Sequence, residues 1–166
     1  MRFRKPSAIL AVSLPMILTP PHKDLLAQAY IGSGKSTCIV LGMLCRVDPS
    51  QKVPQALCVC PTRELVLQNL EVLRQIGKLT GITSECVVPK DGESASKRPI
   101  VMSQVVFGIP GMTNSMICAK ELDVNYLRIF VFDDADYMLA DDEFKIDSLQ
   151  IMKAIRGSDN RCQVLI

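Results

Sequence analysis

Short apolar runs alternate with longer segments of helical character along this chain. Between the runs, residues 35–47 and 63–77 lack turn residues over most of their length, and in the second segment apolar side chains recur at helical spacing until Gly77. Strands that alternate with helices predict a parallel sheet covered on both faces, a three-layer α/β domain with sites at the carboxyl ends of its strands. The apolar runs predicted as buried strands are residues 24–29, 55–60, 82–88, 103–108, 128–133 and 162–166.

Composition is that of one folded domain. The chain has 166 residues, of which 48% are hydrophobic, so it can bury a sizeable core. Its net charge of +2 is too small to attract nucleic acid by itself, and any RNA or DNA surface must be local. The 7 cysteines form no C-x-x-C pair, and the single histidine, His22, gives no zinc-ligand spacing. We therefore expect reduced core cysteines in an intracellular protein, with Cys58 and Cys60 on one face of a strand.

The N-terminus has features of a secretory signal, because Arg2, Arg4 and Lys5 precede an apolar run over residues 8–18 and "AQA" ends at Ala29. Two prolines interrupt this region, and cleavage after Ala29 would remove part of the loop described next. We therefore expect the segment to remain in the protein. No apolar run approaches the ~18–20 residues of a membrane span, so we expect no membrane insertion.

The segment "AYIGSGKST" fits the phosphate-loop pattern G-x-x-x-x-G-K-S/T, except that Ala29 replaces the first glycine. Gly32 and Gly34 allow backbone N–H groups to turn toward phosphate oxygens, and the helix that begins near Lys35 adds its positive end. Lys35 can reach the outer phosphates, and Ser36 can bind Mg²⁺. The predicted nucleotide-binding residues are Ala29, Gly32, Ser33, Gly34, Lys35, Ser36 and Thr37.

Carboxylates cluster at the end of a predicted buried strand, in "VFDDAD" over residues 131–136. In phosphate-loop enzymes an aspartate at the tip of a neighbouring strand holds Mg²⁺ together with the loop hydroxyl, so Asp133 and Ser36 are the predicted metal ligands. The acids at residues 141–143 indicate a solvated helix start, because carboxylates favour helix N-termini.

Five segments stand out along the chain: "KPSAI" (5–9), "AQAYIGSGKS" (27–36), "PTREL" (61–65), "GIPG" (108–111) and "VFDDAD" (131–136). In order and spacing they resemble the first RecA-like domain of DEAD-box RNA helicases. The resemblance covers nearly the whole chain, and the connecting stretches are most similar to the mRNA-export branch, particularly plant members that act at nuclear pores. It implies an N-terminal RecA-like ATP-binding domain over residues 1–166, incomplete and without the second RecA-like domain. It also implies a monomer of the cytoplasm and nucleus with nuclear-pore proteins as candidate partners.

By the same resemblance, the phosphate loop binds ATP, Asp133 holds Mg²⁺, and Lys35 and Asp134 are catalytic. A hydroxyl, a guanidinium and helix N–H groups are common phosphate donors, which agrees with Thr62 and Arg63 at the start of a helix. A structural alternative stays open, in which Thr62 only caps the helix and Arg63 is a surface residue. The residues implied to contact the RNA backbone are Pro61, Thr62, Arg63, Gly108, Pro110 and Gly111.

Departures from the family pattern weaken the implied activity. Leu10 stands where the adenine-reading glutamine would be, so a paired amide is lost and base selectivity with it. Ile109 and Met112 replace threonine and a polar or basic residue in the "GIPG" turn. Asp134 replaces the glutamate that positions the attacking water, and its carboxylate falls back by roughly 1.5 Å. A general base must lie within about 2.6–3.2 Å of its water, so we expect good binding and poor catalysis, with a loss on the order of 10² or more.

The sequence therefore predicts an ATP-binding and RNA-binding domain of a DEAD-box RNA helicase with impaired ATP hydrolysis. Two alternatives stay open. A non-enzymatic decoy or adaptor would keep the helicase surface and compete for its partners; Leu10 and Asp134 favour it, and the intact "GSGKS" disfavours it. An unrelated phosphate-loop kinase or ATPase is the other alternative, and "PTREL" disfavours it.

Overall fold

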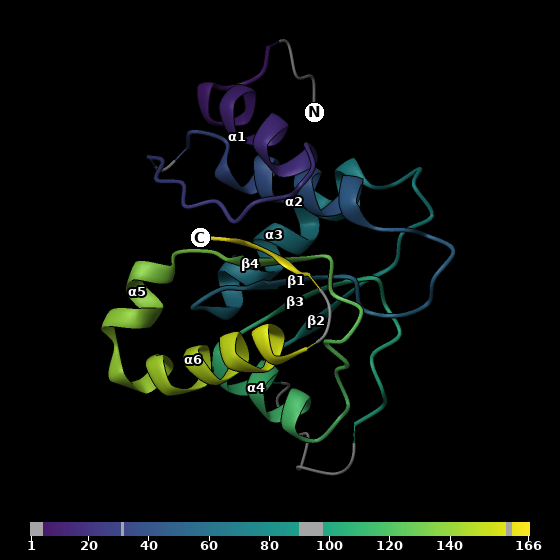
Figure 1. Cartoon of the computed structure of the whole chain (residues 1–166), viewed down its shortest axis with the longest axis vertical. Coiled ribbons are helices and arrows are strands. Elements are labelled where there is room, and N and C mark those ends of the chain that lie inside the picture. The colour runs from purple at the N-terminus through teal and green to yellow at the C-terminus, as the bar shows by residue number, and fades with distance from the viewer. Residues whose placement is uncertain (1–4, 31, 90–97, 159–160) are drawn as a thin grey trace.

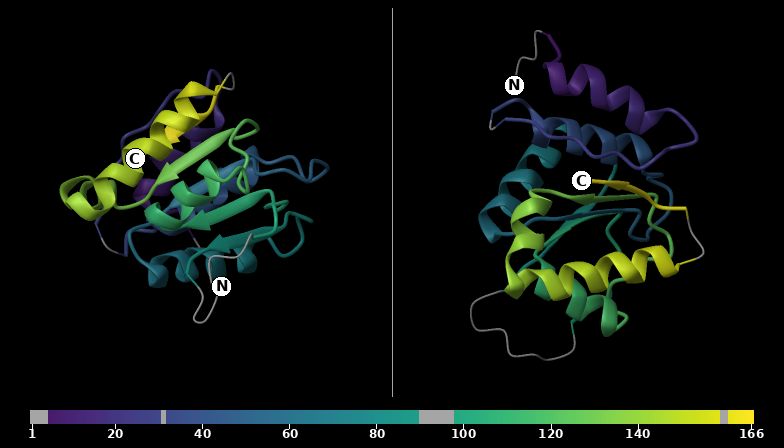
Figure 2. Two further views of the ribbon diagram at one scale, coloured as in Figure 1. Left: turned by 90° about the horizontal axis from the view of Figure 1, so that it is seen from below. Right: turned by 60° about the vertical axis from the view of Figure 1, so that its left-hand side comes forward.

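A parallel sheet lies between two layers of helices (Figure 1). The computed structural model describes residues 5–30, 32–89, 98–158 and 161–166. The strand order is β2-β3-β1-β4-β5, and each neighbouring pair is parallel, as the aligned arrows in Figure 2 show. The three-layer α/β prediction is confirmed. The strands are β1 (Ala56–Val59), β2 (Ser84–Val87), β3 (Val105–Gly108), β4 (Ile129–Phe132) and β5 (Gln163–Leu165).

The helices of the two halves of the chain cover opposite faces of the sheet (Figure 1). The first layer is α1 (Ala8–Leu18), α2 (Lys35–Arg46) and α3 (Arg63–Ile76); the second is α4 (Pro110–Cys118), α5 (Ala135–Ala140) and α6 (Asp142–Gly157). Successive strand side chains point to opposite faces, so Ala56 and Cys58 of β1 join the core of the first layer, whereas Leu57 and Val59 join that of the second. Both faces are covered, which is why the strands are continuous apolar runs.

Most predicted elements are present. The predicted strands at 55–60, 82–88, 103–108, 128–133 and 162–166 each contain an observed strand, and the predicted helices correspond to α2 and α3. Arg2 and Arg4, at the start of the segment that resembles a secretory signal, lie outside the described residues.

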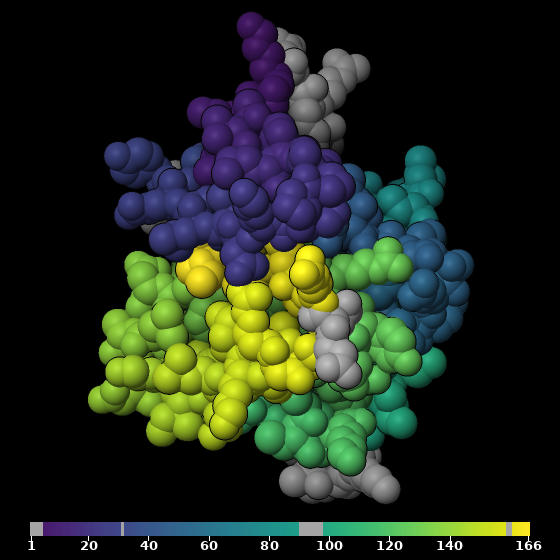
Figure 3. Space-filling view, in the orientation of Figure 1, coloured from purple at the N-terminus to yellow at the C-terminus, as the bar shows by residue number. Residues whose placement is uncertain are grey.

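The strand predicted over residues 24–29 is wrong. This segment runs beside β5 but forms only an isolated bridge, between Leu25 and Leu165. Leu25 N donates to Val164 O at 2.9 Å, Ile166 N donates to Leu25 O at 2.9 Å, and Ala27 N donates to Ile166 O at 2.7 Å. Because β5 has only 3 residues, the pairing ends after these few hydrogen bonds. Figure 3 shows this N-terminal segment lying directly against the yellow C-terminal segment.

The apolar run over residues 8–18 forms α1, which the sequence did not lead us to predict as a helix. Its Ser13 and Ile17 are buried, and the helix packs on α2. The contact is close at Gly42, where an added Cβ would lie 3.1 Å from a methyl group of Ile17. The run is therefore an integral part of the folded domain. Among the described residues, no helix is long and apolar enough to cross a membrane.

The cysteines are all free, as predicted, but they do not all lie in the core. Cys38, Cys58, Cys60 and Cys162 are buried, whereas Cys45 and Cys118 are exposed on α2 and α4, which corrects the prediction for these two. The Sγ atoms of Cys58 and Cys60 are 3.8 Å apart, which confirms that they share a face of β1. Their hydrogen bond and burial raise the pKa of Cys58 well above its usual range.

Gly108 at the end of β3 has no room for a side chain. An added Cβ would lie 2.2 Å from Oγ1 of Thr113 and 3.2 Å from the backbone oxygen of Val87. We expect Gly108→Ala to lower the free energy of unfolding by about 1–3 kcal/mol, because Thr113 is fully buried on α4. Thr113→Ala removes the closest atom, so Gly108→Ala should cost less in that background.

Chemical denaturation of the two single variants and the double variant measures this effect. The control is Gly157→Ala, since nothing lies within 4 Å of a Cβ at that position. Equal stability of Gly108→Ala and the native chain would contradict the expectation.

Candidate nucleotide and RNA site

The carboxyl ends of β1, β3 and β4 meet at one edge of the sheet. The parallel register pairs Val59 with both Gly108 and Phe132. Backbone hydrogen bonds continue the alignment, because Cys60 N donates to Gly108 O at 2.9 Å and Asp133 N donates to Val59 O at 2.9 Å. The segments "PTREL", "GIPG" and "VFDDAD" therefore begin side by side, although they are far apart in the sequence.

The phosphate loop has the backbone that its glycines predict. Gly32 and Gly34 have φ values of +80° and +98°, in the left-handed region that glycine adopts without steric cost. Gly34 precedes α2, and no side chain caps the N–H groups at this helix start. A Cβ on Gly34 would lie 2.8 Å from Oγ of Ser7. The loop thus presents an uncapped helix N-terminus, with Ile31 outside the described residues.

Two hydroxyl groups at this loop are buried and have no hydrogen-bond partner among the described residues, Ser7 Oγ and Ser33 Oγ. A buried hydroxyl without a partner costs about 1–3 kcal/mol, and phosphate oxygens are acceptors that would remove this cost. Ser36 and Thr37 lie half-buried in the first turn of α2. The loop therefore fits the phosphate groups of a nucleotide, with Ser36 available as a hydroxyl ligand for Mg²⁺.

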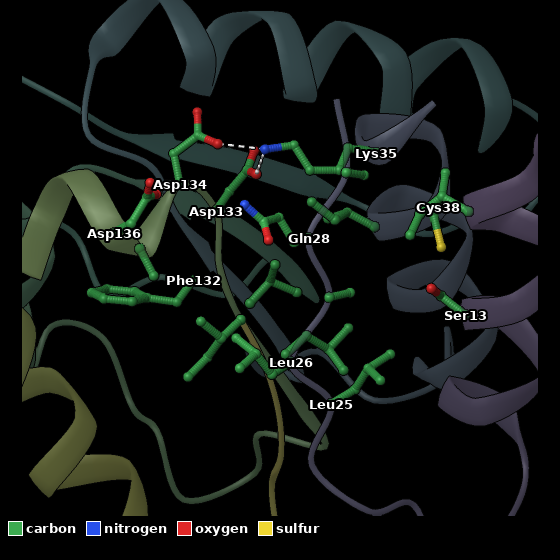
Figure 4. A pocket seen from close by; sticks show the side chains of 18 of the residues that line it. Ser13, Leu25, Leu26, Gln28, Lys35, Cys38, Phe132, Asp133, Asp134 and Asp136 are labelled. Atoms are coloured by element: carbon green, nitrogen blue, oxygen red, sulfur yellow. Dashed lines mark hydrogen bonds and ion pairs between the residues drawn. The ribbon is translucent and has the colours of Figure 1, made fainter. Parts of the chain in front are cut away.

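Lys35 extends from α2 to the acids that follow β4 (Figure 4). Its Nζ donates a hydrogen bond to Oδ1 of Asp134 and lies 3.8 Å from Oδ1 of Asp133. Partial burial acts to lower the pKa of Lys35, but the hydrogen bond to Asp134 and the charges of Asp133, Asp134 and Asp136 outweigh it, so the pKa is raised. The ammonium stays charged, and a nucleotide phosphate must compete with Asp134 for it.

Asp133 is buried, with 7% of its side chain exposed. Burial raises the pKa of its carboxyl group; the hydrogen bond from Asn69 opposes that rise, the charge of Asp134 adds to it, and the charge of Lys35 opposes it. Because the folded state then holds this proton more tightly than the unfolded chain, the contribution to stability falls as the pH rises through the folded pKa. The ionised form of this carboxyl group therefore costs stability in the folded protein, and a bound divalent cation would offset that cost.

Asp134 has a left-handed backbone with φ +55° and ψ +48°, and it precedes α5. Aspartate is one of the few residues with a Cβ that occupies this region readily. Its side chain is 38% exposed, and in Figure 4 its carboxylate points toward Lys35. Lys35 is therefore the hydrogen-bond partner of Asp134 in this structure.

A cavity of about 740 Å³ extends from these charged groups. Lys35, Asp133, Asp134 and Asp136 lie at one end, and apolar side chains of α1, β4, β5 and the segment before the phosphate loop line the rest (Figure 4). Ala29, Pro61 and Thr62 also line it, so the phosphate loop, "PTREL" and "VFDDAD" share one cavity.

The residues implied to contact RNA lie beside this cavity at two helix starts. Thr62 caps α3 by accepting a hydrogen bond from Leu65 N at 3.4 Å, so the capping role is confirmed. Thr62 and Arg63 are exposed. Gly108 and Pro110 are buried, whereas Gly111 in the first turn of α4 is exposed. The surface offered to a ligand is therefore that of Thr62, Arg63 and Gly111.

One positive and one negative side chain lie next to the turn at the start of α4. The guanidinium of Arg98 contacts the sulfur of Met112, and Oδ2 of Asp147 lies 3.3 Å from the position of a Cβ on Gly111. Met112 and Ile109 are otherwise partly buried against the two apolar clusters, as is Leu10. The side chains at these three positions, which depart from the pattern described above, therefore pack against the apolar core.

Asn69 on α3 belongs to the site although no sequence pattern predicted it, and it is 1% exposed. Its Nδ2 donates to Oδ2 of Asp133 at 3.0 Å and to Sγ of Cys60 at 3.5 Å. The sequence signal for Asn69 was a polar amide on the face of α3 that also carries the buried Val66 and Leu70.

The acids at 141–143 start a helix, as predicted. Asp141 caps α6 by accepting a hydrogen bond from Glu143 N at 2.9 Å.

The parallel sheet, the glycine loop before α2 and the acids at the tip of β4 define a RecA-like phosphate-loop domain. Comparison with known families is more specific, because residues 8–166 match the DEAD/DEAH box helicase family. The chain belongs to this family, and the resemblance expected from the sequence is confirmed.

Curated relatives are similar over all or nearly all of this chain. It is 55% identical over 169 residues to DEAD-box ATP-dependent RNA helicase 38 of Arabidopsis thaliana, which covers 100% of this chain and 34% of the relative. It is 39% identical over 155 residues to ATP-dependent RNA helicase DBP5 of Candida albicans, which covers 93% of this chain and 28% of the relative. The chain therefore spans about a third of the length of these relatives.

Solved structures of Saccharomyces cerevisiae Dbp5 share the fold. Dbp5 bound to RNA and ADP BeF3 superimposes with a TM-score of 0.89 at 36% identity, over 98% of this chain and 40% of Dbp5. A Dbp5 variant bound to Nup159, a Gle1 variant, IP6 and ADP superimposes with a TM-score of 0.88 at 36% identity, over 98% of this chain and 42% of that one.

Proposed function

We propose that this chain is the N-terminal RecA-like domain of a DEAD-box RNA helicase and binds ATP with Mg²⁺ and RNA. The observation that carries the proposal is the meeting of Lys35 of the phosphate loop with Asp133 and Asp134 at the tip of β4. The relatives named as ATP-dependent RNA helicases, and the structure of Dbp5 with RNA and ADP BeF3, support the choice of ligands.

In this proposal the glycine loop and the start of α2 hold the nucleotide phosphates, and Lys35 leaves Asp134 to bind the outer ones. Ser36 and Asp133 would hold Mg²⁺, which supplies positive charge that neutralises the phosphate oxygens. Arg63, the N–H groups at the start of α3 and the Gly111 turn would bind the RNA backbone. Asp134 would orient water, poorly because its side chain is short.

Localisation and partners follow from the relatives as proposals. The Dbp5 variant structure contains Nup159 and Gle1, and we propose nuclear-pore proteins as partners, with the protein in cytoplasm and nucleus. We propose that the chain is a monomer. The decoy alternative predicts the same binding without turnover, so hydrolysis separates it from the main proposal.

Nucleotide binding by the phosphate loop can be tested directly. Because its glycines have left-handed backbone and Lys35 is charged, we expect Mg²⁺-dependent nucleotide binding, abolished in Lys35→Ala. Since Leu10 is packed against the core, adenine and guanine nucleotides should bind with similar affinity. Calorimetry with ADP and GDP measures both. The control is Lys145→Ala, an exposed lysine on α6. No binding by the folded native chain would refute the proposal, and strong preference for ADP would refute its second half.

RNA binding should be weak and sensitive to salt, because few cationic groups lie at the two helix starts. We expect the logarithm of the affinity to fall with the logarithm of salt concentration with a slope of about −1 to −2. Arg63→Ala should reduce that slope by about 0.7, whereas Arg74→Ala, exposed at the other end of α3, should not. Fluorescence anisotropy with single-stranded RNA gives the slopes. A tight complex that ignores salt would contradict this surface.

Asp134→Glu should raise ATP hydrolysis, because the longer side chain brings its carboxylate to the distance at which a base can reach water. The gain should appear mainly when the domain is fused to a second RecA-like domain of a related helicase, which contributes an arginine finger. Groups that act on one transition state give non-additive effects. The change carries a small stability cost, since glutamate is less suited to φ +55°.

The measurement is RNA-stimulated phosphate release by native and Asp134→Glu chains, each alone and fused. A gain on the order of 10² in the fused pair is expected. If the fused native chain already turns over as fast as the fused variant, the short carboxylate is not limiting.

A further inference from the structure

Asn69 is a buried amide whose position in the fold calls for an explanation. It lies on the face of α3 that packs against the sheet, where Val66, Leu70 and Leu73 are also buried. Burying an amide without hydrogen bonds is costly, so the hydrogen-bond partners of Asn69 are the reason it is tolerated here. Its partners here are the carboxylate of Asp133 and the sulfur of Cys60.

The two oxygens of the Asp133 carboxylate have different neighbours. Oδ2 accepts the hydrogen bond from Asn69 Nδ2 at 3.0 Å, whereas Oδ1 lies 3.8 Å from Nζ of Lys35. The amide therefore fixes the rotation of the carboxylate about its Cβ–Cγ bond, so that Oδ1 faces the phosphate loop. Cys60 in turn holds the amide from the end of β1, at 3.5 Å.

We propose that Asn69 is a positioning residue that orients the Asp133 carboxylate so that Oδ1 can bind the divalent cation that accompanies the nucleotide. This inference rests on the proposed function. Groups that hydrogen-bond a metal ligand from behind fix its orientation, and their loss typically costs about 10- to 100-fold in metal affinity. Without the amide, the carboxylate can rotate and pair more closely with Lys35, which takes its oxygens away from the cation.

The test compares affinity for ADP with Mg²⁺ and affinity for ADP with EDTA, measured by calorimetry on the whole chain. The ratio of the two affinities isolates the contribution of the cation. In Asn69→Leu, which keeps the branching at Cγ and suits the apolar face of the helix, the ratio should fall about tenfold or to one, while affinity for metal-free ADP stays at the native value. Asn69→Ala, a good helix former without the amide, should give the same result if Asn69→Leu does not fold.

The matched control is Gln104→Leu. Gln104 is a fully buried amide at the opposite edge of the sheet, where its Oε1 accepts from Thr83 N at 2.8 Å and its Nε2 donates to Pro49 O at 3.1 Å. Its loss removes a comparable set of hydrogen bonds far from the cation, so the ratio should remain native even if stability falls.

The outcomes separate the claims. A native ratio in folded Asn69→Leu or Asn69→Ala would overturn the positioning role, and so would an equal fall of the ratio in Gln104→Leu, because a general loss of stability would then explain it. If the native chain binds no ADP under either condition, the proposed function itself fails and the inference falls with it. Native ADP binding without any effect of Mg²⁺ would leave nucleotide binding in place but overturn the cation role of Asp133, and with it the positioning role of Asn69.

Discussion

The parallel register that aligns β1 with both β3 and β4 is the constraint on which the site depends. Each of these strands has only 4 residues, and all three end at the same level, so the segments that follow them meet at one edge. Successive side chains of each strand face opposite helix layers, and a slip of one residue would exchange the two cores and move Asp133 out of line with the phosphate loop. Packing and chemistry thus select the same register.

The site places the carboxylate of Asp133 at a buried position, at the end of the central strands. Asp133 is held by Asn69 from α3 and faced by Lys35 from α2, so both long helices of the first layer meet at one carboxylate. A buried ionised group of this kind is weak support for stability, since desolvation offsets the attraction between the charges. Its retention is better explained by a ligand that brings a cation, which is consistent with the uncapped start of α2 nearby.

Sequence patterns predicted much of the fold because buried parallel strands and the glycine loop leave local signals. Where they failed, the deciding contact was not local. The run before the phosphate loop has strand composition, but beside the short β5 it forms only a few backbone hydrogen bonds, at Leu25 and Ala27. Residues 8–18 are apolar on nearly every side and contain Pro15, so helical periodicity was absent. Asn69 contacts a carboxylate 64 positions away, which no spacing rule reveals.

The two acids after β4 have acquired different roles through their partners. Asp133 keeps a neutral donor, Asn69, and therefore stays in place whether or not Lys35 is engaged. Asp134, in contrast, has the ammonium of Lys35 as its partner, and its left-handed backbone directs the short side chain there. Under the proposed function, a phosphate that binds Lys35 would break this hydrogen bond and release the Asp134 carboxylate. Nucleotide binding and hydrolysis would then be separable steps, since hydrolysis would rely on a carboxylate that binding sets free.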